Sequence, residues 1–290
     1  AYDYISESVR FFLDYMFEHD GYLLTGPSMS PENVYIKNGK HAYLAVSPTM
    51  DIEMIGGLLR FYIEAENILN INPEMKAEAE AALKKMPPIK ISSRGTIQEW
   101  MEDYEEQEPG HRHISHLFGL YPGWEISPNT PELFAAAKKT IERRMANGGG
   151  HTGWSAAWTI LFYCRLADRK GTEEAFQRLL GHSTFDNLLD KHPPFQIDGN
   201  FGGCAAVAES VLQSHNFQIR LLPAVPESIT CGSFDNLMAR GGIEVSAKWA
   251  DNKVTWYRLY AKHDITFELF YNGISKKITM KAGETLTETL

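Results

Sequence analysis

Cysteine is scarce in this sequence, and its three copies stand far apart. They are Cys164, Cys204 and Cys231 in a chain of 290 residues, so no Cys-x-x-Cys pair predicts a thiolate metal site. The odd number also excludes a complete internal disulfide framework. Because Cys164 and Cys204 stand in apolar runs, we expect both to be small core residues.

Long apolar runs and an excess of basic residues are also missing. No window of about 18 apolar residues predicts a membrane-spanning helix. The formal net charge is −9, which argues against a nucleic-acid partner because phosphate binding needs a basic surface. Part of the acidic excess is concentrated between residues 99 and 108, and we interpret that run as a solvated helix face or loop.

Several familiar catalytic signatures are absent. The sequence has no P-loop, no Gly-x-Gly-x-x-Gly after a strand, no Gly-x-Ser-x-Gly elbow and no His-Glu-x-x-His. Kinase, dehydrogenase, serine hydrolase and zinc peptidase functions therefore have no support. A signal peptide is missing too, and the chain starts inside a predicted helix without Met, so we expect a fragment or a processed form.

The residues that are present predict a long helical part. In the first helix, Ile5, Val9 and Phe12 fall on one face at helical spacing. Thr49 or Asp51 is expected to cap the second helix. Further helices are predicted from Pro73 to before residue 87, near 98–105, and over 130–145, 154–168, 173–180 and 205–214.

After residue 217 the pattern changes to that of strands. Segments 243–249, 254–261 and 265–271 are short, alternating and rich in β-branched and aromatic residues. Asp251 and Asn252 lie between the first two segments and predict a hairpin turn. We therefore predict a helical domain over residues 1–217 and a small antiparallel β domain over residues 218–290.

Two loops each present one carboxylate in a rigid setting. Glu32 follows a proline in loop 26–33, where it is either a surface acid or a general acid. Asp198 lies in loop 192–203 among two prolines and three glycines. It is either a helix cap or a carboxylate presented as a base.

A third loop, residues 110–122, gathers imidazole side chains around Arg112. His111, His113 and His116 suggest zinc, but their spacing is not that of ligands on one helix face, and an arginine separates two of them. Recognition of hydroxyl groups fits the same residues equally well. His116 stands nearest the apolar stretch, so we expect it to be a hydrogen-bonded core residue.

One Glu, one Asp, an Arg/His cluster and aromatic residues together are the parts of a glycosidase. Trp154 is a candidate for stacking on a sugar face, whereas Trp158 is expected to pack in the core. Two alternatives remain open. The first is a carbohydrate-binding module without catalysis, and the second is a metal protein that uses the three histidines.

The longest motifs closely resemble those of glycoside hydrolase family 95, a family of α-L-fucosidases. They are SMSPEN (28–33), HRHISHLFGLYPG (111–123), HTGWSAAW (151–158), PPFQIDGNFGG (193–203), the LLPAVP join and ARGGIEV (239–245). The resemblance runs in order over nearly the whole chain. It implies an inverting hydrolase that removes terminal α-1,2-linked L-fucose from oligosaccharides or glycans, without a cofactor or metal.

The resemblance also implies residue roles. Glu32 is expected to be the general acid, Asp198 to belong to the base that activates water, and Arg112 and His113 to bind the sugar. Trp154 and Asn200 as substrate contacts are our own extension. An inverting mechanism needs the two carboxyl groups about 6.5–9.5 Å apart to leave room for the water. An α-L-galactosidase on the same scaffold is an alternative, because L-galactose differs from L-fucose at C6 only.

The fold implied is an (α/α)6 barrel followed by a β domain. Such a barrel needs twelve helices, and this chain is predicted to have seven or eight, so we expect a mainly α fold with a partial toroid. A missing N-terminal segment or self-association would then cover apolar helix faces. We expect poor or no activity from the isolated chain. By resemblance alone, the location is extracellular or periplasmic.

Overall fold

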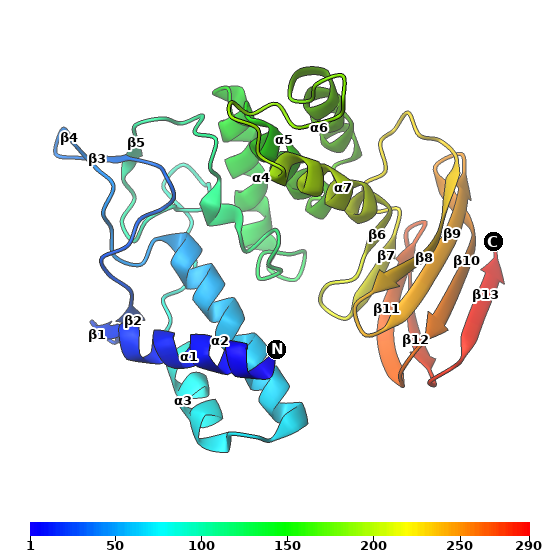
Figure 1. Ribbon diagram of the computed structural model, residues 1–290, viewed down its shortest axis with the longest axis horizontal. Helices are drawn as coiled ribbons and strands as arrows, with labels where there is room; N and C mark the ends of the chain where they lie inside the picture. The colour runs from blue at the N-terminus through cyan, green and yellow to red at the C-terminus, as the bar shows by residue number, and fades with distance from the viewer. The chain divides into compact units, whose positions relative to one another are not determined.

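The computed structural model describes all 290 residues, which divide into two compact units, residues 1–149 and 150–290. The first unit contains α1 (Tyr2–Tyr15), α2 (Thr49–Leu69), α3 (Pro73–Lys84), the 3₁₀ turn η1 (Ser115–Leu117) and α4 (Pro131–Ala146) (Figure 1). The second contains α5 (Gly153–Arg165), α6 (Arg169–His182) and α7 (Asp198–Val211), followed by a β domain. The domain boundary predicted after residue 217 lies beyond the end of α7, and it stays a prediction.

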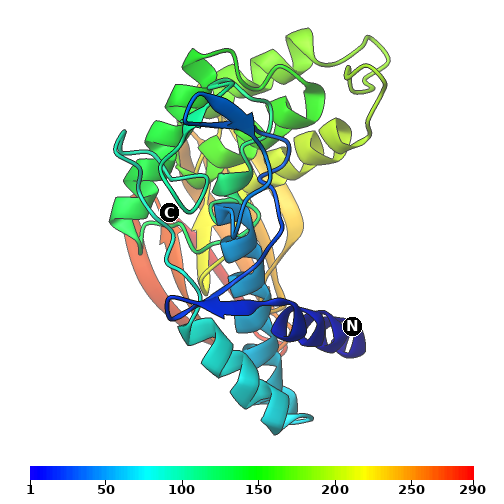
Figure 2. The same cartoon turned by 90° about the vertical axis from the view of Figure 1, so that its left-hand side faces the viewer.

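Three helices of the first unit share one buried apolar cluster, and their apolar faces follow the predicted period. Val9 of α1 lies in one buried cluster with Leu59 and Tyr62 of α2 and Met75 of α3. Figure 2 shows these helices, dark blue to cyan, lying together. Pro73 begins α3 as predicted, and the side chain of Asn72 caps it by accepting a hydrogen bond from the Met75 amide.

Two details of the first unit differ from the sequence predictions. No side chain caps α2; instead the Thr49 hydroxyl donates a hydrogen bond to the Gln98 carbonyl. The short helix predicted near 98–105 is also wrong. The Gln98 amide group donates to the carbonyls of Trp100 and Met101, and this local bonding competes with helical hydrogen bonds.

Short strands occupy parts of the long loops of the first unit. The strands β1 (Phe17–His19) and β2 (Tyr22–Leu24) form a hairpin. The strands β3 (Tyr35–Lys37), β4 (Lys40–Ala42) and β5 (Glu105–Glu106) form a small sheet in the order β4-β3-β5. This sheet joins the segment that follows Glu32 to the acidic segment before residue 110.

In the second unit, α5 packs against α6 and α7. The approach of α7 is close at Gly202, where an added Cβ would lie 2.9 Å from the Cβ of Ala157 on α5. This contact explains why α7 begins at Asp198 rather than near the predicted residue 205, because packing against α5 outweighs the low helix propensity of glycine. Cys164 is buried as predicted, but Cys204 is exposed, and that prediction was wrong.

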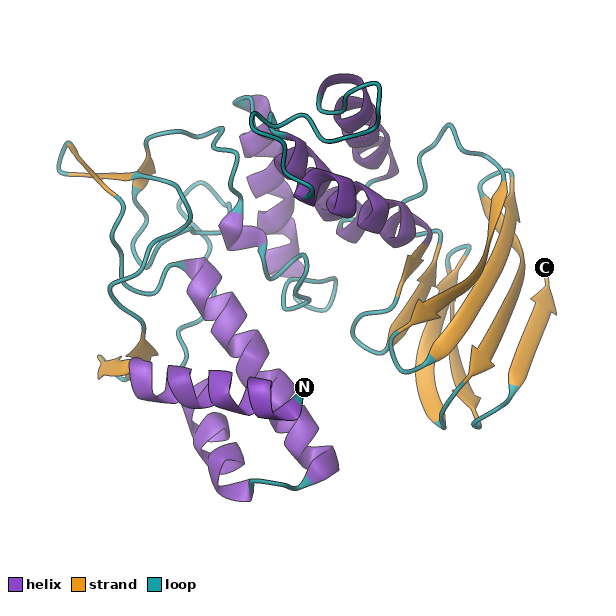
Figure 3. Cartoon of the chain, in the orientation of Figure 1, coloured by secondary structure: helices purple, strands orange, loops and turns teal.

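The β domain consists of two four-stranded sheets (Figure 3). One has the order β13-β10-β9-β8, and the other has the order β12-β11-β7-β6. Their bounds are β6 (Leu212–Gln213), β7 (Gln218–Leu221), β8 (Gly232–Ala239), β9 (Ile243–Ala250), β10 (Lys253–Ala261), β11 (Ile265–Tyr271), β12 (Ile274–Met280) and β13 (Thr285–Thr289). Apolar residues of both sheets form one core, including Val245, Tyr257 and Leu269.

Strand pairing in this domain is antiparallel except between β7 and β11, which are parallel. Asp251 and Asn252 join β9 to β10 with φ angles of 51° and 61°, as a tight hairpin of the predicted kind requires. None of the helices has both the length and the apolar character needed to span a lipid bilayer.

Candidate functional site

The loop that carries Glu32 is tied down on both sides of that residue. Ser28 pairs with Ala45 through two backbone hydrogen bonds of 2.9 and 2.7 Å. The Asn33 amide donates to the Ser30 carbonyl at 2.9 Å, which closes a turn around Pro31 and Glu32. The Glu32 side chain is 59% exposed at the outside of this turn. The turn therefore presents an accessible carboxylate, and a buried side chain beneath it, called the anchor below, holds the turn in place.

The anchor is Glu99, which lies beneath the turn with its side chain only 3% exposed. One of its oxygens accepts a hydrogen bond from the Ser30 hydroxyl at 2.7 Å. The other accepts from the Asn33 amide group at 3.0 Å and from Arg144 at 2.7 Å. The sequence prediction of a solvated acidic run is therefore wrong for Glu99.

The structure places Arg112 and His113 beside Glu32, while their predicted role in sugar binding stays a prediction. Arg112 forms a charged hydrogen bond with the Glu32 carboxylate, and His113 Nε2 lies 3.7 Å from the same oxygen. Burial lowers the pKa of His113 to about 4, although the charge of Glu32 opposes this effect. His113 is therefore neutral at physiological pH and offers one donor and one acceptor, which suits a sugar hydroxyl.

The other two histidines of this loop, His111 and His116, are buried in the protein. His111 is buried, and its Nδ1 accepts a hydrogen bond from the His113 amide at 3.1 Å. His116 is buried beside Glu99, as predicted, but its Nδ1 has no hydrogen-bond partner, so the predicted hydrogen bonding is not seen there. Burial lowers the pKa of His116 to about 3. No group of three metal-ligating side chains in this structure is arranged to hold a metal ion.

In the second unit, Asp198 is the first residue of α7 and is exposed. Two residues later, the side chain of Asn200 accepts a hydrogen bond from the Asp190 amide at 2.9 Å and donates to the Leu188 carbonyl at 2.7 Å. Asn200 thus ties the preceding loop to the helix that carries Asp198. The predicted contact of Asn200 with substrate stays a prediction.

Asp190 is a residue that the sequence analysis missed. It is 2% exposed, and neither carboxylate oxygen receives a hydrogen bond of normal geometry, although the backbone amides of Gln196 and Lys191 lie near it. A Cβ added to Gly153 would lie 1.3 Å from Asp190 Oδ1, and one added to Gly199 would lie 2.3 Å from it. Both glycines are therefore required for the close packing of this carboxylate between the first turns of α5 and α7.

The two tryptophans at the start of α5 are both partly buried. Their ring centroids are 6.4 Å apart, and Trp158 also packs on the fully buried Phe162 at 5.0 Å. The core role predicted for Trp158 agrees with this contact. The role of Trp154 as a sugar-stacking residue stays a prediction.

Sequence reasoning singled out Glu32, Arg112 and His113, which the structure brings together, but it missed the buried Glu99 and Arg144. Glu99 was hidden in an acidic run, and Arg144 stands in an ordinary charged helix end. The one available signal was the apolar context of Glu99, between Ile97 and Trp100, which are both buried.

Comparisons with known proteins agree with these motifs. The family model described as the glycosyl hydrolase family 95 catalytic domain matches residues 1–211, and the model of the family 95 C-terminal domain matches residues 213–289. The chain is 36% identical to alpha-L-fucosidase 2 of Arabidopsis thaliana over 99% of its own length and 36% of the relative. It is 32% identical to a probable alpha-fucosidase A of Aspergillus niger over 58% of this chain and 24% of the relative.

A solved structure described as a putative kojibiose phosphorylase from the human microbiome shares the fold. It matches with a TM-score of 0.60 and 11% identity over 100% of this chain and 46% of that chain. This likeness confirms the predicted fold class, which is a helical part followed by a small β domain. The chain has seven α-helices, fewer than the twelve of a complete (α/α)6 toroid, and it spans about a third of the length of its plant relative.

Proposed function

We propose that this chain, which belongs to glycoside hydrolase family 95, carries the proton donor and part of the base of an inverting α-L-fucosidase. The two relatives, an alpha-L-fucosidase and a probable alpha-fucosidase, support a fucoside substrate. The observation that carries the proposal is the group formed by an accessible Glu32, a charged Arg112 and a neutral His113 over a buried anchor.

In the proposed reaction, Glu32 donates its proton to the glycosidic oxygen while the bond from that oxygen to C1 of the fucose breaks. A water molecule adds to C1 from the opposite face of the ring, and Asp198 helps to take up the proton of that water. The product sugar then has the β configuration. The partner sugar leaves as a free alcohol.

The contact between Glu32 and Arg112 imposes a condition on this reaction. An ion pair stabilises a carboxylate, whereas a general acid must carry a proton. We therefore expect the bound sugar to draw Arg112 away from Glu32 and onto a sugar hydroxyl. Arg112 would then both bind the substrate and, by leaving the carboxyl group, allow it to hold its proton.

We propose terminal α-1,2-linked L-fucose on oligosaccharides or glycans as the substrate, and an extracellular or periplasmic location. L-Galactosides are the alternative substrate. Because the chain spans about a third of its plant relative, we also propose that the isolated chain has low activity. We propose that full turnover requires a further N-terminal segment, as the resemblance to the family implies.

The test is fucose release from 2′-fucosyllactose, followed by anomer-resolved NMR. We expect β-L-fucose to appear first, with more release when the N-terminal segment of a family relative is added in trans. Glu32→Gln and Asp198→Asn should each lower turnover by at least about a hundredfold while binding persists. If both variants bind as the parent chain does and no fucose is released under any condition, the chain is a binding module and the proposal fails.

A further inference from the structure

We propose that Glu99 is a positioning residue that holds Glu32 and its Arg112 partner in place for proton donation. The inference rests on the function proposed above. Glu99 is too deeply buried to touch a substrate, since its side chain is 3% exposed. It must therefore act through the residues that it binds.

The first link is to the loop of Glu32. Ser30 donates a hydrogen bond to one oxygen of Glu99, and Asn33 donates to the other. These two residues stand on either side of Pro31 and Glu32, so the buried carboxylate is hydrogen-bonded to both ends of the turn. The Ser115 hydroxyl adds a hydrogen bond of 2.9 Å to the Pro31 carbonyl.

The second link is to the segment that leads to Arg112. Arg144, only 2% exposed, donates to Glu99 at 2.7 Å and to Glu106 at 2.8 Å. The same guanidinium donates to the carbonyls of Glu108 and Pro109 at 3.1 and 3.2 Å. Glu99 and Arg144 thus connect the Glu32 turn to the chain immediately before Arg112.

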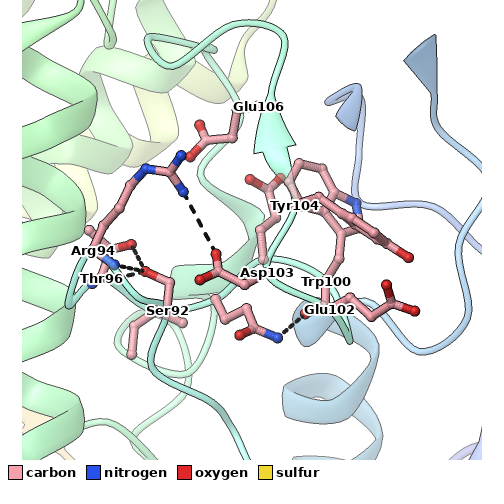
Figure 4. A pocket seen from close by; sticks show the side chains of 11 residues that line it. Ser92, Arg94, Thr96, Trp100, Glu102, Asp103, Tyr104 and Glu106 are labelled. Carbon is pink, nitrogen blue, oxygen red and sulfur yellow. Dashed lines mark hydrogen bonds and ion pairs between the residues drawn. The ribbon is translucent and has the colours of Figure 1, made fainter. Parts of the chain in front are cut away.

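The main chain on either side of Glu99 is fixed as well. The Thr49 amide, at the start of α2, donates to the Glu99 carbonyl at 3.0 Å. Figure 4 shows the polar recess lined by residues between 92 and 106, in which the Arg94 side chain pairs with Asp103. The side chain of Gln98, next to Glu99 in the sequence, donates a hydrogen bond to the Trp100 carbonyl. Glu99 is therefore held by its backbone while its side chain holds the turn.

This arrangement matters for one chemical step in particular. A proton donor must lie within hydrogen-bonding reach of the glycosidic oxygen, and small displacements of a catalytic group lower its effect strongly. A leaving group that departs without protonation does not depend on the donor. Loss of the anchor should therefore affect poor leaving groups much more than good ones.

The test variant is Ser30→Ala, which removes one hydrogen bond to Glu99 and leaves the pair between Glu99 and Arg144 intact. Ser127→Ala is the matched control, because Ser127 is also a buried serine of the first unit but lies outside this network. Each protein is assayed on 2′-fucosyllactose, whose leaving group needs a proton, and on α-L-fucosyl fluoride, whose fluoride departs without one.

For Ser30→Ala we expect kcat on 2′-fucosyllactose to fall by about tenfold, with less than about a twofold change on the fluoride. The control should leave the ratio of the two rates unchanged. An equal loss on both substrates would mean a merely structural role and would overturn the inference. No change on either substrate would overturn it too.

Amide hydrogen exchange gives a second readout that needs no activity. The Asn33 amide donates within the turn, and we expect its exchange to become about tenfold faster in Ser30→Ala but not in Ser127→Ala. Unchanged exchange would contradict the anchoring role. If the parent chain hydrolyses neither substrate even with the added N-terminal segment, the proposed function fails, and the exchange rates alone decide whether Glu99 holds the turn.

Discussion

The loops that carry Glu32 and Asp198 are held in different ways. Beneath Glu32, the buried Glu99 carboxylate has its charge matched by Arg144 and receives two further hydrogen bonds. In the loop before Asp198, the buried Asp190 carboxylate receives no hydrogen bond of normal geometry and is packed against glycine backbone. The carboxylate beneath the first loop is fixed by charge and hydrogen bonds, whereas the carboxylate in the second loop is fixed by close packing, with Asn200 adding hydrogen bonds to the backbone of that loop.

This difference has a physical consequence. Removing one partner of a buried ion pair costs much free energy of folding, because the remaining charge is left buried without a partner. An unpaired buried carboxylate is itself the costly group, so that neutralising it should help the fold. The same chemical change, from a carboxylate to an amide, should therefore have opposite effects on stability at Glu99 and at Asp190.

The largest effect is expected for Glu99→Gln. The amide is close in size but carries no charge, so Arg144 keeps Glu106 as its only carboxylate partner, beside two carbonyls. We expect the free energy of unfolding of the first unit to fall by about 3 kcal/mol. Chemical denaturation followed by circular dichroism measures the change.

The matched control is Glu102→Gln, because Glu102 is 64% exposed and makes one long ion pair of 3.4 Å with Lys37. It should alter the free energy of unfolding by less than about 0.5 kcal/mol. If Glu99→Gln changed the free energy of unfolding as little as the control does, the ion pair between Glu99 and Arg144 would not stabilise the first unit. The proposed difference between the two loops would then be wrong.

The second prediction addresses close packing. Gly153→Ala would place a methyl group 1.3 Å from the present position of Asp190 Oδ1, so the carboxylate or the start of α5 must move. We expect a loss of about 1–3 kcal/mol in the free energy of unfolding. The measurement is thermal unfolding, together with amide exchange in the loop before α7.

Gly181→Ala serves as its control. Gly181 lies in α6 with no atom within 4 Å of an added Cβ, so alanine should stabilise the protein by roughly 0.5–1 kcal/mol. Equal responses at the two glycines would indicate that the Asp190 side chain moves aside freely, and that close packing does not hold this loop.

The surroundings of Glu99 and Asp190 also show which parts of the structure could be predicted from the sequence. Helix periodicity and proline position predicted α3 and α4 well, because the spacing of apolar residues and the lack of a proline amide are local features of the sequence. The start of α7 could not be predicted, because its glycines have low helix propensity and the close approach of Gly202 to Ala157, far away in sequence, is not visible in the local pattern. Tertiary packing supplied the missing information.

The candidate site divides in the same way. Motifs indicated Glu32, Arg112 and His113, whose residue types suit sugar chemistry. They did not indicate Glu99 or Asp190, because an acidic residue gives no local sign that it is buried. Burial depends on which distant segments cover it, and that is decided by the complete fold.

The smallest effect is expected for Asp190→Asn, and its sign is opposite to that of Glu99→Gln. Burial raises the pKa of the Asp190 carboxyl, an effect that His192 and nearby backbone amides oppose only in part. The folded state therefore binds this proton more tightly than the unfolded chain, in which an aspartate has a pKa of about 3.9. Stability should fall as the pH rises from about 3.9 through the raised folded-state pKa.

Asparagine cannot ionise, so Asp190→Asn should unfold with a free energy higher by roughly 1 kcal/mol at pH 7 and match the parent chain at acidic pH. Denaturation curves recorded from about pH 3.5 to about pH 8, a range that includes the titration of a carboxyl group, measure this difference in the free energy of unfolding. Asp190→Ala, which empties the space between Gly153 and Gly199, should be less stable than Asp190→Asn throughout. If Asp190→Asn instead destabilises the chain at pH 7, the amides at the starts of α5 and α7 must stabilise the Asp190 charge, and both loops would rest on electrostatics after all.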